Sequence, residues 1–339
     1  MKIGIVGYQG SGKSTLFQWL TGVPPNPARA HESQTAMATV PDPRVPALCE
    51  IYRPKKVTQA ALEIVDTPGL SRSHEGSAAR LAAIREAGCL VVVVAAHGGA
   101  DAVADLARFE DDLLIADLDI VTRRIERLED QVKKPRPNRD ELQKELHALR
   151  PLQTVLEEGR SLHGLEMTPD QERAVRSFQL FSDKPRLVIV NVPDDETDLQ
   201  QYEQASGQHA IAVPLRLQLD LSTMEPGERD EFCREMGVRV IDRDVLIREI
   251  MDASGQMLFF TAGDREVRSW MIRRGGTAVE AAGAIHTDLA RGFIRAEVMS
   301  CADLFRLGSE REVKQQNLMR KEHRDYVIQD DEILLIQHN

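Results

Sequence analysis

The chain has 339 residues, of which 42% are apolar and 29% charged, and it carries a net charge of −11. This length accommodates two domains with an insertion, and the composition is that of a globular protein. The negative charge excludes nucleic-acid binding driven by net charge, because neutralising phosphates takes an excess of Lys and Arg. The longest apolar run, residues 89–96, is too short to span a bilayer and is typical of a buried strand.

The N-terminus and the cysteines indicate a cytoplasmic protein. No secretory signal is visible, since Met1 leads directly into a strand-like segment without a charged region, an apolar stretch and a cleavage site. Cys49, Cys89, Cys233 and Cys301 lie far apart, with no CxxC pair and no nearby His ligands. We therefore expect free thiols in a reducing compartment, with no disulfide partner, no cysteine-bound metal and no membrane association.

A phosphate-binding loop follows the first expected strand. That strand covers residues 2–6, a helix is expected at 14–20, and the segment 7–14 between them has the pattern GxxxxGKS. Glycines let backbone N–H groups point at phosphate oxygens, and the helix adds its positive N-terminal end. We expect Lys13 to reach the β- and γ-phosphates and act in catalysis, and Ser14 to bind Mg²⁺. The residues expected to hold ATP or GTP here are Gly7, Gln9, Gly10, Ser11, Gly12, Lys13, Ser14 and Thr15.

A second motif, Asp-Thr-Pro-Gly, comes at the end of an expected strand at residues 60–66. We expect Asp66 to meet Mg²⁺ through water, and the Gly69 N–H to sense the γ-phosphate during catalysis. A switch-loop Thr would complete the metal shell when the γ-phosphate is bound. Thr35 and Thr39 both fall in the right region, near an expected edge strand, and we favour Thr35.

The residue after this motif is Leu70, where many small GTPases place a Gln that orients the attacking water. An apolar side chain cannot orient water. We therefore expect hydrolysis either to recruit another group or to be slow. His74 and His97 lie near enough in the sequence to be candidates for that group.

The segment from about Asp117 to Leu165 has apolar residues at three- and four-residue steps, interrupted by a Pro-containing stretch at 134–139. This pattern predicts two antiparallel helices joined by a turn. The helices fall between apolar strands expected at 89–96 and 186–191, so they form an insertion. With a last strand at 209–215, the alternation of strands and helices predicts a mostly parallel sheet with helices on both faces.

The base-reading motif is incomplete. Asn191, Val192 and Asp194 lie just after a buried strand, where guanine-specific proteins carry NKxD, and we expect these three residues to contact the nucleotide. A carboxylate at 194 can accept hydrogen bonds from guanine, which keeps GTP open. The Lys whose stem would pack on the base is replaced by Val192, and this weakens the case for GTP. The choice between ATP and GTP therefore stays open.

After Met251 the chain changes to short strands, expected at 258–261, 267–272, 293–298 and 333–337, with one helix around 278–284. Together they predict a compact α+β module that is long enough to fold alone. We expect a discontinuous nucleotide-binding domain at 1–116 and 184–253, a helical insertion at 117–183, and this C-terminal module at 254–339.

With these residues in view, the chain resembles the YchF group of Obg-like ATPases within the P-loop proteins. The resemblance covers nearly the whole length, and it is strongest in the C-terminal module. The matching segments are residues 4–17, 40–45, 116–119, 260–263, 266–273, 281–288, 291–298 and 326–330.

This resemblance implies an α/β fold with a P-loop parallel sheet, an inserted antiparallel coiled-coil hairpin and a C-terminal TGS domain of the β-grasp type. It also implies ribosome binding, Mg²⁺ as cofactor, ATP hydrolysis in preference to GTP, and a catalytic His, for which His97 is the candidate. The family's Asn-x-x-Glu is Asn191-x-x-Asp194 here. The leading hypothesis is a slow, Mg²⁺-dependent ATPase that acts as a ribosomal switch. The alternatives are a GTP-binding switch of the same fold and a nucleotide-binding scaffold with negligible hydrolysis.

Overall fold

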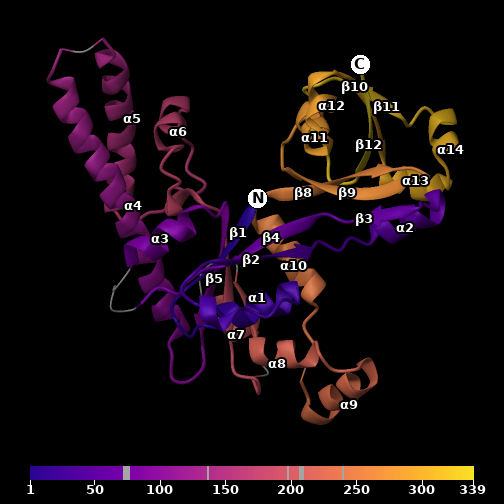
Figure 1. Cartoon of the computed structure of the whole chain (residues 1–339), viewed down its shortest axis with the longest axis horizontal. Helices are drawn as coiled ribbons and strands as arrows, with labels where there is room; N and C mark the ends of the chain where they lie inside the picture. The colour runs from indigo at the N-terminus through magenta and orange to yellow at the C-terminus, as the bar shows by residue number, and fades with distance from the viewer. Residues whose placement is uncertain (72–76, 136, 197, 206–209, 239) are drawn as a thin grey trace. The chain divides into compact units, whose positions relative to one another are not determined.

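The computed structural model describes the chain except for residues 72–76, 136, 197, 206–209 and 239 (Figure 1). The chain forms two compact units. The first consists of residues 1–36 and 63–241, and the second of residues 37–62 and 242–339. The three-part division expected from the sequence stays a prediction. The compact units differ from it in that residues 37–62 and 242–253 group with the C-terminal module.

The nucleotide-binding fold is built on a six-stranded sheet with the order β2-β4-β1-β5-β6-β7. The pairs β1–β4, β1–β5, β5–β6 and β6–β7 are all parallel, as the sequence predicts. The expected last strand is shorter than predicted, because it ends before Pro214, and His209 lies outside the described residues. The strands are β1 (Lys2–Val6), β2 (Gln34–Thr39), β4 (Ala61–Asp66), β5 (Cys89–Ala95), β6 (Arg186–Asn191) and β7 (Ala210–Val213).

The centre of the first unit is apolar. Every residue of β5 is buried, and Val92 packs in one core cluster with Phe109 and Phe181 from beyond the sheet. The order of the parallel strands places the carboxyl ends of β1, β4, β5 and β6 at one edge, where ligands bind in open α/β sheets. Apart from the helical insertion, the helices of the first unit are α1 (Lys13–Thr21), α3 (Ser77–Arg85), α7 (Gln200–Ala205), α8 (Leu215–Leu221) and α9 (Pro226–Met236).

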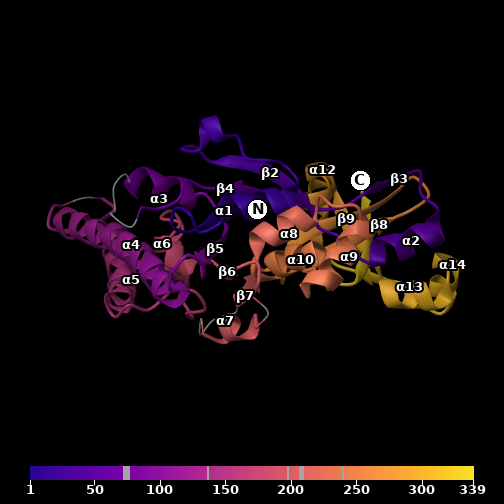
Figure 2. The same cartoon turned by 90° about the horizontal axis from the view of Figure 1, so that it is seen from below.

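The helical insertion is an antiparallel hairpin, as predicted, and its helices α4 (Ala102–Val132) and α5 (Arg139–Glu157) lie side by side (Figure 1, Figure 2). Arg124 of α4 donates two hydrogen bonds of 2.7 Å to Glu145 of α5. A leucine-rich cluster that includes Leu128 and Leu149 fills the interface between the helices. The first helix begins at Ala102, well before the expected start at Asp117. It is therefore continuous from the sheet domain into the arm. The short helix α6 (Pro169–Val175) also belongs to this cluster.

The second unit is a six-stranded sheet with the order β11-β10-β12-β8-β9-β3. A cluster of apolar residues that includes Phe259, Ala281 and Val298 joins the sheet to α11. The strands are β3 (Lys56–Thr58), β8 (Gln256–Ala262), β9 (Glu266–Arg273), β10 (Phe293–Ser300), β11 (Arg320–Glu322) and β12 (Glu332–His338). The helices are α2 (Arg44–Tyr52), α10 (Arg243–Ala253), α11 (Ala278–Ile285), α12 (Thr287–Arg291), α13 (Cys301–Leu307) and α14 (Glu310–Gln315). All four expected strands and the expected helix are present.

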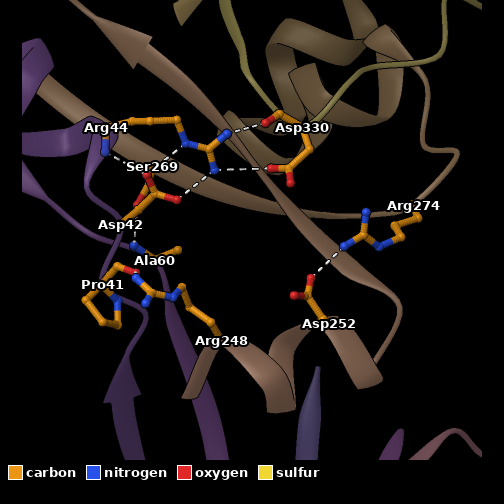
Figure 3. Close-up of polar contacts among 9 residues, drawn as sticks. All are labelled: Pro41, Asp42, Arg44, Ala60, Arg248, Asp252, Ser269, Arg274 and Asp330. Atoms are coloured by element: carbon orange, nitrogen blue, oxygen red, sulfur yellow. Dashed lines mark hydrogen bonds and ion pairs between the residues drawn. The ribbon is translucent and has the colours of Figure 1, made fainter. Parts of the chain in front are cut away.

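Residues 37–62 are built into this second sheet although they come early in the chain. Strand β3 pairs in parallel with β9, and the Ala60 N–H donates a 2.9 Å hydrogen bond to the Ser269 hydroxyl (Figure 3). Sequence patterning does not detect β3, because a three-residue strand contains too few positions to show alternation. The segment thus adds an edge strand and a helix to the C-terminal module.

Arg44 is the main polar tie between this segment and the rest of the second unit (Figure 3). Its guanidinium donates to both carboxylate oxygens of Asp42, at 2.8 and 2.6 Å. It also donates to the Asp330 carbonyl and, at 3.2 Å, to the Asp330 carboxylate. The ring of Phe260 lies 4.8 Å from the guanidinium carbon. The Arg44 guanidinium therefore binds a buried carboxylate and a loop distant in the sequence, and it packs on the face of an aromatic ring.

The described residues contain no helix long and apolar enough to cross a membrane. The four cysteines are free, with Cys89 and Cys301 buried. Burial raises the pKa of both thiols to about 12, so they are inert at neutral pH.

We expect Arg44→Met to lower the free energy of unfolding of the second unit by about 1–3 kcal/mol, because the buried Asp42 carboxylate loses its partner. Arg306→Met is the matched control, because its pair with Asp303 lies at the surface, where solvent screening leaves a much smaller contribution. Denaturant unfolding monitored by the fluorescence of Trp270, in a background in which Trp19 of the first unit is replaced by Phe, measures both. Equal losses for the two variants would contradict the role given to Arg44.

Candidate nucleotide-binding site

The loop between β1 and α1 has the backbone that phosphate binding requires. Gly12 has φ +106°, and a Cβ there would lie 2.5 Å from the Asn191 Nδ2 atom. Only glycine meets both demands. The loop therefore lies against the Asn191 side chain. Helix α1 begins at Lys13, and the N-terminal end of this helix carries a positive partial charge.

Lys13 is buried in this loop. Its ammonium donates a 2.7 Å hydrogen bond to the carbonyl oxygen of Tyr8, and 7% of the residue is exposed. Desolvation lowers the pKa of Lys13 to about 8, the negative charge of Asp66 opposes this shift, and the positive charge of Arg80 adds to it. A buried cation with so little compensation favours an incoming anion, and the phosphates of a nucleotide supply one.

Ser14 and Asp66 supply oxygen ligands of the kind that Mg²⁺ prefers. The Ser14 hydroxyl donates a 2.7 Å hydrogen bond to Asp66 Oδ2, while Asp66 Oδ1 is buried and has no hydrogen-bond partner among the described residues. Burial raises the pKa of Asp66, and the Ser14 hydrogen bond and the Lys13 charge counteract this. A buried carboxylate oxygen without a partner is costly unless a cation or water joins it. These residues therefore fit a magnesium ion, with Ser14 as a ligand and Asp66 beside it.

Gly69 passes so close to the phosphate loop that a side chain cannot fit. A Cβ would lie 2.7 Å from the Lys13 Nζ atom and 3.0 Å from the Gln9 backbone. The Leu70 N–H donates to the Gly7 carbonyl at 3.1 Å, and the Gln9 N–H donates to the Leu70 carbonyl at 3.1 Å. These bonds hold the motif against the loop. Lys13 and Gly69, which are 56 positions apart in the sequence, are therefore neighbours.

Arg80 and Leu70 lie next to Gly69, and the sequence alone does not predict their contacts. Arg80 of α3 donates a 2.9 Å hydrogen bond to the Gly69 carbonyl, which fixes that peptide. Leu70 is 2% exposed and packs in the core of the first unit. Its side chain is turned away from solvent, so it neither orients water nor leaves room for a water at its own position.

At the other end of the loop, Asn191 ties three segments together. Its Nδ2 donates to the Ser11 carbonyl at 3.1 Å, and its Oδ1 accepts from the Leu215 N–H at 3.2 Å. Asp194 Oδ1 accepts from the Leu217 N–H at 3.1 Å. Val192 is 2% exposed and lies in the core, so its side chain is not offered to a base.

His97 lies at this same end. Its Nε2 atom is 3.1 Å from the Asn191 Nδ2 atom, on the exposed turn after β5. A contact of its ring with Lys13 or Gly69 is not found within the part of the chain that the structure describes. The other histidine candidate, His74, lies outside the described residues.

The two switch threonines both lie in strand β2, where their residues are exposed. Within the described residues, Thr35 makes no hydrogen bond with Ser14 or Asp66. Ser11 and Thr15 flank Gly12 and Lys13 on the loop and the first helical turn, and the buried Ser11 hydroxyl lacks a hydrogen-bond partner. Gly10 has φ +80° and open space around it. The structure thus brings together Lys13, Ser14, Asp66 and Gly69, and the role of Thr35 or Thr39 as the switch threonine stays a prediction.

Comparison with known proteins agrees with this arrangement. A family model described as a 50S ribosome-binding GTPase matches residues 2–123, and YchF-GTPase_C, described as a protein of unknown function, matches residues 257–339. The chain is 31% identical over 362 residues to the ribosome-binding ATPase YchF of Haemophilus influenzae, which covers 100% of this chain and 99% of the relative. The chain belongs to the YchF family.

Other members of the YchF family extend the match. Obg-like ATPase 1 of Oryza sativa subsp. japonica is 32% identical over 366 residues, covering 100% of this chain and 92% of the relative. The solved structure of the Schizosaccharomyces pombe YchF GTPase matches with a TM-score of 0.84 and 25% identity, over 99% of this chain and 97% of that one. These matches confirm the family resemblance and the P-loop fold with its inserted hairpin and C-terminal module.

Nucleotide binding should take up protons above neutral pH. The pKa of Lys13 is about 8 in the free protein, and phosphate oxygens beside the ammonium raise it. The free protein has lost part of this proton at pH 8, so the association constant should fall as the pH rises through about 8. Titration calorimetry of Mg·ATP in buffers of different ionisation enthalpy should give an uptake of about half a proton at pH 8 and close to one at pH 9.

Lys13→Arg is the control for this experiment, because a guanidinium keeps its charge throughout the range and does not titrate. If the variant binds, its proton uptake should vanish. An unchanged uptake in Lys13→Arg, or none in the native protein, would contradict the assignment to Lys13.

Proposed function

We propose that this protein is a Mg²⁺-dependent, ATP-preferring P-loop nucleoside triphosphatase that works in the cytoplasm as a slow, ribosome-associated switch. The observation that supports this most is the convergence of Lys13, Asp66 and Gly69 on one site. It provides a buried cation, a carboxylate oxygen for a metal and a backbone N–H for the γ-phosphate. Several relatives are named ribosome-binding ATPases.

The preference for ATP is supported because the described residues at the base end do not offer the two side-chain contacts that recognise guanine. Guanine recognition uses a carboxylate turned to the base and an alkyl stem packed on it. Here Asp194 caps the backbone of α8 through Leu217, and the position after Asn191 is a buried Val. Neither feature excludes GTP, and one relative of solved structure is titled a GTPase. A GTP-binding switch is therefore the alternative to be tested.

Slow turnover is supported by the side of the site where water would attack. Leu70 is buried, and His97 contacts Asn191 at the base end. Within the described residues, Lys13 and the Gly69 N–H, together with Mg²⁺, then stabilise charge, and neither Leu70 nor His97 positions water. The same observation favours a second candidate, a nucleotide-occupied scaffold that hardly hydrolyses.

A turnover assay separates these two candidates. We expect phosphate release from Mg·ATP to be slow, to fall by at least about 100-fold in Lys13→Ala, and to change when ribosomes are added. The control is Lys55→Ala, an exposed lysine of the second unit. If native protein and Lys13→Ala release phosphate equally slowly with and without ribosomes, the enzyme proposal is wrong and the scaffold is favoured.

A competition experiment decides the base. Unlabelled ATP and GTP compete against a fluorescent ATP analogue, and ATP should displace it at several-fold lower concentration. Asp194→Asn should leave the ATP affinity within about threefold, because an amide oxygen still accepts from the Leu217 N–H. An affinity for GTP tenfold or more above that for ATP would overturn the proposed preference.

A further inference from the structure

Tyr8, the second residue of the phosphate loop, joins the loop to the helical arm. Its hydroxyl donates a 2.8 Å hydrogen bond to Asp112 Oδ2, and its ring meets the Phe109 ring edge-on, with centroids 5.6 Å apart and planes at 88°. Phe109 and Asp112 both lie on α4. Tyr8 is 5% exposed and Phe109 is 1% exposed, so the ring contact is buried, while the hydrogen bond to Asp112 is partly buried. A hydrogen bond to a carboxylate and an edge-to-face ring pair each constrain position as well as distance.

The backbone of the same residue contacts the catalytic group and the γ-phosphate motif. The Tyr8 carbonyl accepts the hydrogen bond of the Lys13 ammonium, and Tyr8 forms a parallel β-bridge with Leu70. Tyr8 is therefore in contact with Lys13 on one side and Leu70 on another, while its side chain is held by the arm. Phosphate oxygens compete with the Tyr8 carbonyl for the Lys13 ammonium. Nucleotide binding therefore alters the hydrogen bond that Lys13 donates to Tyr8.

Tyr8 contacts α4 in the first half of this long helix, so a small rotation at the contact moves the far end of the helix by a larger distance. Helix α4 is a single helix of 31 residues, capped at Asp101 and packed against the sheet core through Phe109 and Leu113. At 1.5 Å per residue it extends for about 46 Å, and about 30 Å of that lies beyond Asp112. A small rotation at Asp112 is carried along the helix to the arm, where Arg124 and Leu128 bind α5.

We propose that Tyr8 is a positioning residue that couples Lys13 to the arm, so that nucleotide occupancy and the position of α4 regulate each other. The inference rests on the proposed function, because it concerns the same nucleotide site. Coupling of this kind is reciprocal: a partner that shifts the arm changes nucleotide affinity by the same factor by which the nucleotide changes the partner's affinity. A ribosome that binds the arm acts on the nucleotide site by this route.

Hydrogen exchange of the full chain tests the coupling. Peptides that cover residues 102–120 are followed with and without saturating Mg·ATP, and the native protein should show a nucleotide-dependent change there. Tyr8→Phe removes only the hydroxyl and keeps the ring against Phe109. It should bind Mg·ATP within about threefold of the native affinity, while the change in residues 102–120 falls to less than half.

The matched control is Tyr202→Phe, which removes another tyrosine hydroxyl bonded to a carboxylate, that of Glu196 at 3.0 Å, in the same unit. Its exchange response should equal that of the native protein. Asp112→Leu tests the other partner, since it keeps a side chain of similar size but removes both acceptor oxygens, and it serves if Tyr8→Phe does not fold.

The outcomes separate this inference from the proposed function. If the native protein does not bind Mg·ATP more tightly than Lys13→Ala, the proposed function fails. If it binds normally but residues 102–120 do not respond, or respond as in the native protein in both Tyr8→Phe and Asp112→Leu, the coupling through Tyr8 is overturned. With ribosomes present, the shift in Mg·ATP affinity should likewise be smaller in Tyr8→Phe than in Tyr202→Phe.

Discussion

The buried ammonium of Lys13 is the constraint on which the nucleotide site depends. Burial lowers the pKa of Lys13 to about 8, and among the described residues the charge of Asp66 compensates only in part, while the positive charge of Arg80 adds to the lowering. The protein therefore keeps a cation that is stabilised fully only when phosphate is present. Gly69 follows from this, since the space its side chain would fill is the space of the ammonium.

The ends of the phosphate loop are held in different ways. At the γ-phosphate end, backbone bonds between Gly7, Gln9 and Leu70 clamp the Asp-Thr-Pro-Gly motif to the loop. At the base end, a single side chain, Asn191, bonds to the loop and to the start of α8. At the base end, both the Nδ2 and the Oδ1 atoms of Asn191 already make hydrogen bonds within the protein. For this reason the local motif leaves the choice between ATP and GTP undecided.

The sequence predicts those parts of the site that lie in contiguous motifs. Lys13, Ser14, Asp66 and Gly69 follow from local spacing, because strand ends and a tight loop leave them few positions. The contact of Tyr8 with Asp112 spans 104 positions, and no local pattern reveals it. Burial has the same limit: the pKa of Lys13 depends on desolvation and on the charges of Asp66 and Arg80, which lie in two other segments of the chain.

The second unit shows the same limit at the level of the fold. Its four long strands follow from their alternation. Strand β3 does not, because its place beside β9 is decided by residues 210 positions later, such as Glu266 opposite Lys56. The early start of α4 is a related case: the pattern of the arm is visible from Asp117, while the part from Ala102 is shaped by packing against the sheet.

The connection between the two units follows from where residues 37–62 belong. They leave the first unit after Ala36 and return to it at Glu63, and the chain crosses once more between Ile241 and Asp242. Two of these three crossings lie in β2 and β4, the strands that carry Thr35 and Asp66. Because Arg44 and β3 fasten residues 37–62 within the second unit, that unit is covalently continuous with both strands. Two of the three chain connections between the units thus run through strands that carry residues of the expected metal site, and only the third, at Ile241 and Asp242, lies outside the strands.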